Sequence, residues 1–143
     1  MYYGCGESDS GRQDGESGQE DRIMDAEAVV RDLCQAFSRM DVDELLEFFE
    51  DDAVYVKMPV GRFVGKDEIR GTLEEFFGPE VRVEFEILAL VASADTVCVE
   101  RVVHFETGGN RFDLPAMAIF EVTPAGKVSG WRDYFDRGQA GLE

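Results

Sequence analysis

The chain has 143 residues, of which 31 are acidic and 14 are basic, so its formal net charge at neutral pH is −17. Phosphate backbones and anionic lipid surfaces are bound by clustered Lys and Arg, so this charge balance argues against nucleic acid and the membrane surface as partners. No signal-peptide pattern and no run of 18 apolar residues occurs, which predicts a cytoplasmic protein.

Composition divides the chain into two parts. Residues 1–22 are mostly Gly, Ser, Asp, Glu and Gln, and their apolar surface is too small to offset the entropy of ordering, so we predict a disordered acidic tail. Residues 23–143 are predicted to form a single domain, because about 120 residues can bury roughly two-thirds of their unfolded surface. Cys5, Cys34 and Cys98 are odd in number and widely spaced, which indicates reduced thiols rather than disulfides or a zinc site.

Apolar residues spaced three and four apart predict two helices at the start of the domain. The first follows Asp25 and covers 26–40. Asp41 and Glu44 resemble a capping box that starts a second helix, whose apolar face extends to Phe49.

A short strand is predicted next, at 53–58, before a stretch interrupted by glycine. Gly61 and Gly65 break the chain, and helical spacing returns over 69–77 to predict a third helix. After that helix the apolar period changes to two, which predicts four strands over 81–91, 96–106, 111–123 and 127–136. Helices first and antiparallel strands last indicate an α+β fold, with the helices across one face of a curved sheet.

Two charged residues lie on faces that are otherwise apolar. In the strand 96–106, Arg101 shares a face with valines, and in the last strand Asp133 shares a face with Trp131 and Phe135. A buried charge without a partner is costly, so we infer that Arg101 and Asp133 form an ion pair.

Further polar groups share this region of the predicted sheet. Tyr55 and Lys57 lie on one face of the short strand and bring a hydroxyl and an ammonium group toward the same cavity. Four converging polar groups at an apolar end of a sheet are typical of a small-molecule site. The alternative is a buried ion pair that only fixes core packing. His104 projects from the face opposite Arg101, which favours a surface or interface histidine.

Three segments resemble the limonene-1,2-epoxide hydrolase family: Tyr55-Val56-Lys57-Met58-Pro59, Glu100-Arg101-Val102 and Gly130-Trp131-Arg132-Asp133-Tyr134-Phe135-Asp136. The similarity covers residues 25–137. It implies a cone-shaped α+β fold like that of nuclear transport factor and ketosteroid isomerase, in which three N-terminal helices pack over the concave face of a curved antiparallel or mixed sheet. It also implies a homodimer that uses no metal and no cofactor.

The resemblance implies a role for each matching residue. Asp133 matches the base that takes a proton from water as the water attacks an epoxide carbon. Tyr55 matches a water ligand, and Arg101 matches an arginine that bridges two carboxylates. Two positions differ, because Val103 replaces the carboxylic acid that protonates the epoxide oxygen and Lys57 replaces a water-holding asparagine. We expect the Lys57 ammonium to be the substitute acid.

Three hypotheses about function stay open. The first is hydrolysis of a small apolar epoxide in one step by general acid/base catalysis. The second is an isomerase or cyclase of the ketosteroid-isomerase type, in which Asp133 abstracts a carbon-bound proton and Lys57 or Tyr55 stabilises the enolate oxygen. The third is a non-catalytic small-molecule-binding protein. The side-chain alternation along the strands and the family pattern together predict an apolar wall that binds the substrate. Its residues are Phe37, Phe76, Val103, Phe105, Leu114 and Phe135.

Overall fold

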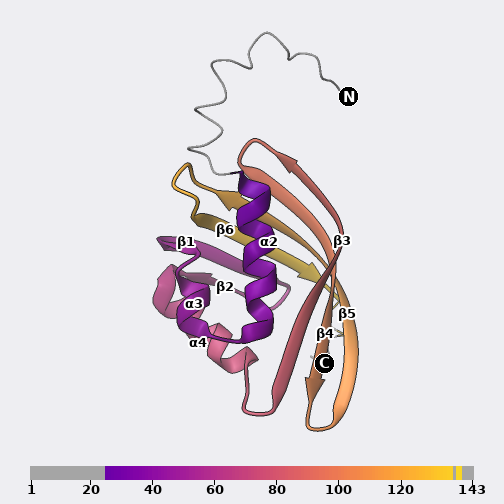
Figure 1. Ribbon diagram of the computed structural model, residues 1–143. Helices are drawn as coiled ribbons and strands as arrows, with labels where there is room; N and C mark the ends of the chain where they lie inside the picture. The colour runs from indigo at the N-terminus through magenta and orange to yellow at the C-terminus, as the bar shows by residue number, and fades with distance from the viewer. Residues whose placement is uncertain (1–24, 137, 140–143) are drawn as a thin grey trace.

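A six-stranded mixed sheet forms the larger layer of the molecule (Figure 1). The computed structural model describes residues 25–136 and 138–139, so the tail predicted at 1–22 lies outside the described residues. In spatial order the strands are β2 (Gly61–Val64), β1 (Phe49–Met58), β6 (Val128–Phe135), β5 (Asn110–Val122), β4 (Thr96–Thr107) and β3 (Val81–Ser93). β1 and β6 run parallel, and all the other neighbouring strands run antiparallel.

Three α-helices lie over the concave face of this sheet. α2 (Ala26–Ala36) crosses it diagonally in Figure 1, and α3 (Val42–Leu46) and α4 (Gly65–Phe76) lie beside β1 and β2. A short 3₁₀ turn, η2 (Phe37–Arg39), continues α2. The curved sheet and its helical layer confirm the predicted α+β fold. Within the part of the chain that the structure describes, no helix is long and apolar enough to cross a membrane.

The second helix is shorter than its apolar spacing predicts. Asp41 caps it as expected, since its side chain accepts a hydrogen bond from the Glu44 amide at 3.2 Å. The helix nevertheless ends at Leu46, and Phe49 is the first residue of β1, so its assignment to the helix was wrong. The physical reason is tertiary packing, because Phe49 is buried against Trp131 and pairs with β6.

The strand β2 was not predicted. Gly61 was interpreted as a break, but it begins this strand and pairs with Lys57 of β1. Gly65, at the start of α4, has a φ of 86°, which glycine adopts without the steric cost of a side chain. A four-residue strand that begins with one glycine and is followed by another is too short to show a period of two, so its pairing depends on the neighbouring strand rather than on its own pattern.

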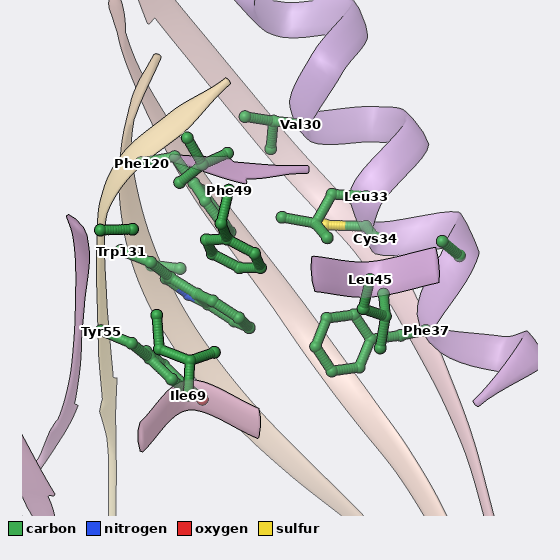
Figure 2. Packing of buried hydrophobic residues seen from close by; sticks show 14 of the residues in the cluster. Val30, Leu33, Cys34, Phe37, Leu45, Phe49, Tyr55, Ile69, Phe120 and Trp131 are labelled. Atoms are coloured by element: carbon green, nitrogen blue, oxygen red, sulfur yellow. The ribbon is translucent and has the colours of Figure 1, made fainter. Parts of the chain in front are cut away.

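The core lies between α2 and the sheet and is centred on Trp131 (Figure 2). The Trp131 ring stacks on Tyr55 at a centroid distance of 4.0 Å and on Phe49 from its other side at 6.0 Å. Phe37 meets the same indole edge-on at 5.5 Å. Aromatic side chains bury 150–250 Å² each, so this cluster accounts for a large share of the core. It also fixes the Tyr55 side chain in place.

His104 lies on the opposite, outer face of the sheet, as predicted. Its Nδ1 is 2.7 Å from an Asp113 oxygen and its Nε2 is 2.8 Å from a Glu86 oxygen. The hydrogen bonds to Asp113 and then to Glu86 raise the pKa of His104 above its usual 6.5. Both ring nitrogens donate in the imidazolium form, so this form satisfies both carboxylates.

The His104 contacts predict a pH-dependent contribution to stability. Because the folded-state pKa is raised, the stabilisation is fully present below the unfolded value of 6.5 and is lost as the pH rises through the folded value. Arg111 also faces this cluster, 3.7 Å from Asp113, but stays charged over the whole range. We expect the melting temperature of the wild type to exceed that of His104→Gln at about pH 6 and the difference to shrink toward about pH 9. Two pH profiles that run parallel would contradict this prediction.

Candidate active site

One cavity of about 350 Å³ contains the predicted site. Its walls include every residue predicted to be catalytic or substrate-binding: Phe37, Tyr55, Lys57, Phe76, Arg101, Val103, Phe105, Leu114, Asp133 and Phe135. Four other lining residues were not predicted from the sequence: Leu73, Phe85, Phe112 and Ala116. The volume falls within the usual range of small-molecule sites, roughly 300–1,000 Å³.

The Asp133 carboxylate is buried among hydrogen-bond donors. Its Oδ1 accepts from Arg101 Nη2 at 2.9 Å and from Trp131 Nε1 at 3.1 Å. Its Oδ2 accepts from Tyr55 Oη at 3.2 Å and from the same Arg101 nitrogen at 3.1 Å. The inferred Arg101–Asp133 pair therefore forms, and Tyr55 and Trp131 complete the set of contacts around the carboxylate.

The sheet register explains how Arg101 reaches Asp133 across an intervening strand. Arg101 of β4 pairs with Ala116 of β5, and Ala118 of β5 pairs with Asp133 of β6. Both alanines are buried, and their methyl groups leave room for the guanidinium to cross β5. The Arg101 guanidinium carbon also lies 4.4 Å from the centroid of the Phe85 ring, which is a cation–π contact.

Tyr55 is held in its protonated form. Burial and then the neighbouring Asp133 charge raise the pKa of Tyr55 well above its usual value of 10. The phenol therefore donates to Asp133, and its oxygen keeps lone pairs that can accept a hydrogen bond from water or substrate.

Lys57 lies opposite Asp133 in the parallel β1–β6 ladder, but its ammonium group has another partner. Its Nζ donates to Thr72 Oγ1 of α4 at 3.1 Å. Phe76 carries its ring 5.7 Å from the same nitrogen. Among the described residues, the hydrogen-bond partner of this ammonium group is therefore a hydroxyl and not a carboxylate. Burial lowers the pKa of Lys57, and the charges of Asp133 and Glu75 oppose that shift only in part.

The rest of the cavity is apolar. Val103 is buried on β4 next to Arg101, and phenylalanine pairs such as Phe76 and Phe105, 5.3 Å apart, extend the wall. Cys34 lies nearby in the core, where burial raises the pKa of its thiol to about 11 and so keeps it protonated. No group of three or more His, Cys, Asp or Glu side chains suited to a metal ion occurs among the residues with described positions.

Comparison with known proteins relates this chain to proteins of one fold. The family model for the SnoaL-like domain matches residues 30–131. An LEH-like epoxide hydrolase from M. tuberculosis is 28% identical, with a TM-score of 0.71 over 82% of this chain and 88% of that chain. SalBIII is described as an epoxide hydrolase/cyclase-like enzyme with a role in pyran ring formation in the polyether salinomycin. It is 20% identical, with a TM-score of 0.71 over 85% of this chain and 96% of that chain.

A Shewanella putrefaciens protein that has been assigned as a SnoaL-like polyketide cyclase shares the fold as well. It is 16% identical, with a TM-score of 0.74 over 81% of this chain and 93% of that chain. At such identities SalBIII and the cyclase support the fold alone.

Proposed function

Because the chain belongs to the SnoaL-like domain family, we propose that it is an enzyme that adds water to a small apolar epoxide. The observation that carries the proposal is the buried Asp133 carboxylate, held by Arg101, Tyr55 and Trp131 at the polar end of an apolar cavity. The resemblance of the chain to an LEH-like epoxide hydrolase supports the same reaction.

In the proposed reaction Asp133 is the general base. It takes a proton from water as the water oxygen bonds to one epoxide carbon, while Tyr55 accepts a hydrogen bond from that water. Arg101 orients the carboxylate through its two contacts. The carbon–oxygen bond of the epoxide breaks at the same time, and its electron pair stays on the oxygen.

Lys57 is the proposed acid. Its ammonium gives a proton to the epoxide oxygen, which leaves a neutral amine and a diol. The lowered pKa of Lys57 favours this step, since a buried ammonium releases its proton more readily than an exposed one. The proton taken up by Asp133 then returns to Lys57 through solvent, and both groups regain their starting states.

A second candidate is an isomerase or cyclase. It is favoured by Val103, because the cavity wall next to Arg101 is apolar there, whereas the Lys57 ammonium keeps N–H donors for an oxyanion. Asp133 would remove a proton from carbon, and Lys57 would hold the enolate oxygen. A binding protein without turnover would keep the cavity and form no product.

Diol formation tests the role of Lys57. We expect the wild type to convert an epoxide from a panel that includes limonene oxide and cyclohexene oxide, and Lys57→Met to lower kcat by roughly 10²–10⁴-fold, the usual contribution of a general acid. Lys57→Arg is the matched control, because it keeps the positive charge but holds its proton too tightly to be an acid. We expect it to be as slow as Lys57→Met.

Other outcomes would redirect the proposal. If Lys57→Arg is as fast as the wild type, Lys57 supplies charge rather than a proton. If no epoxide in the panel gives a diol and solvent deuterium enters the α-carbon of a ketone, the isomerase hypothesis replaces hydrolysis. Saturable ligand binding with neither reaction would leave the binding protein.

A further inference from the structure

The ionisable groups of the cavity do not balance in charge. Lys57 and Arg101 are cationic, Asp133 is the only carboxylate among the lining residues, and Tyr55 is a neutral phenol. The cavity therefore holds one excess positive charge, although the chain as a whole carries −17. A single positive charge inside a mostly apolar cavity is costly unless an anion compensates for it.

Arg101 is only partly neutralised. Its Nη2 makes both contacts with Asp133, whereas its Nε and Nη1 are buried without a hydrogen-bond partner in the described protein. The Asp133 carboxylate also accepts hydrogen bonds from Trp131 and Tyr55, so it is not devoted to Arg101 alone. The positive field of the guanidinium is therefore not cancelled at the cavity wall.

Lys57 has donors left over. An ammonium group has three N–H bonds, and the structure gives the Lys57 group one acceptor, the Thr72 hydroxyl. Two donors thus remain at the edge of a cavity lined by Phe76 and other phenylalanines. One can reach the reacting oxygen of the proposed reaction, and the other can hold a second oxygen of the same ligand.

From this imbalance we propose that the cavity takes an apolar carboxylic acid, bound as the carboxylate. The carboxylate of the ligand accepts hydrogen bonds from the Lys57 ammonium and is attracted by the positive charge of Arg101. The hydrocarbon part of the ligand packs against the phenylalanine wall. This inference rests on the proposed function in placing the substrate in this cavity, and it names the class of that substrate. Binding compensates the excess charge, which a neutral ligand of equal shape does not do.

The test compares 4-phenylbutanoate with 4-phenylbutanamide, which have the same carbon skeleton and differ in charge. Titration calorimetry with the full chain at about 0.15 M salt screens the distant surface charges. We expect the carboxylate to bind about tenfold or more tightly than the amide. Fluorescence of Trp131, the single tryptophan, gives an independent readout because its indole contacts Asp133 and Tyr55.

Matched variants locate the preference in the cavity. Val103→Asp adds a negative charge two residues from Arg101 on the same strand face, and we expect it to remove the preference for the carboxylate. Val103→Asn adds a polar group of similar size without the charge and should keep the preference. Lys57→Met should weaken the binding of the carboxylate at least tenfold and leave that of the amide unchanged.

Three results would overturn the inference. The first is that the wild type binds the carboxylate and the amide equally tightly. The second is that Val103→Asn and Val103→Asp lose the preference for the carboxylate to the same extent. The third is that neither ligand binds. None of these readouts requires turnover. If the carboxylate is preferred but no epoxide gives a diol, only the hydrolase proposal is contradicted. If neutral epoxides give diols but the carboxylate is not preferred, only the present inference is contradicted.

Discussion

Replacing Asp133 by Asn is expected to reduce diol formation by roughly 10²–10⁴-fold, the contribution of a well-placed general base. The amide keeps the shape of the carboxylate and one oxygen that can accept from Arg101, but it cannot take a proton from water. The loss should appear in kcat, measured under saturating epoxide. Far-ultraviolet circular dichroism and Trp131 fluorescence would show whether the variant is folded.

Asp136→Asn is the matched control for this change. Asp136 directly follows β6, and its carboxylate accepts from the Gly138 amide at 2.8 Å outside the cavity. The same chemical change there should leave kcat within about twofold of the wild type, because exposed substitutions away from a site have small effects. Full activity in a folded Asp133→Asn variant would remove Asp133 as the base, whatever the control shows.

The central pair of the site was predictable because strand alternation is strict. Arg101 and Asp133 each lie on a face whose other residues are apolar, and the cost of burying a lone charge is large enough to infer a pair. The register that brings them together, across Ala116 and Ala118, depends on pairing among three strands. The sequence of a single strand does not specify that pairing.

Some lining residues could have been found by the same rule. Phe112 and Ala116 share the face of Leu114 by alternation, so extending the predicted wall along this strand would have included both. The partner of Lys57 could not be found in this way. Thr72 reaches Lys57 only because α4 packs beside β1, and no local pattern specifies the distance between them.

The missed parts of the fold have a common cause. Phe49 continues the helical spacing that starts at Val42, but contact with Trp131 and pairing with β6 outweigh the local preference for helix. β2 has no detectable period and is formed by pairing with β1. Both lie at the β1 end of the sheet, where tertiary contacts rather than sequence pattern decide the element.

Arg101→Met is expected to destabilise the protein by about 3–5 kcal/mol, the usual cost of leaving a buried charge without its partner. Arg101 is 2% exposed and Asp133 is 5% exposed, so solvent cannot replace the guanidinium. The remaining donors to Asp133, Tyr55 and Trp131, are neutral. Urea unfolding followed by Trp131 fluorescence would measure the change in the free energy of unfolding.

Arg132→Met is the control for the loss of an arginine. Arg132 neighbours Asp133 on β6, but its side chain is on the other face, 3.6 Å from Glu121, with 34% of the side chain exposed. An exposed pair of this kind contributes about 0–1 kcal/mol, so the control should lose far less stability. A similar loss in both variants would mean that burial of the Arg101–Asp133 pair is not what makes it costly to break.

The double variant Arg101→Met/Asp133→Leu separates the charge from the packing. It removes both buried charges, so it should be more stable than Arg101→Met alone, even though Tyr55 and Trp131 lose their acceptor. Since such a protein keeps the cavity walls but lacks the base, it should fold and form no diol. Recovery of stability without recovery of activity would indicate that the buried pair is kept for chemistry rather than for the fold, and a double variant less stable than Arg101→Met would indicate the opposite.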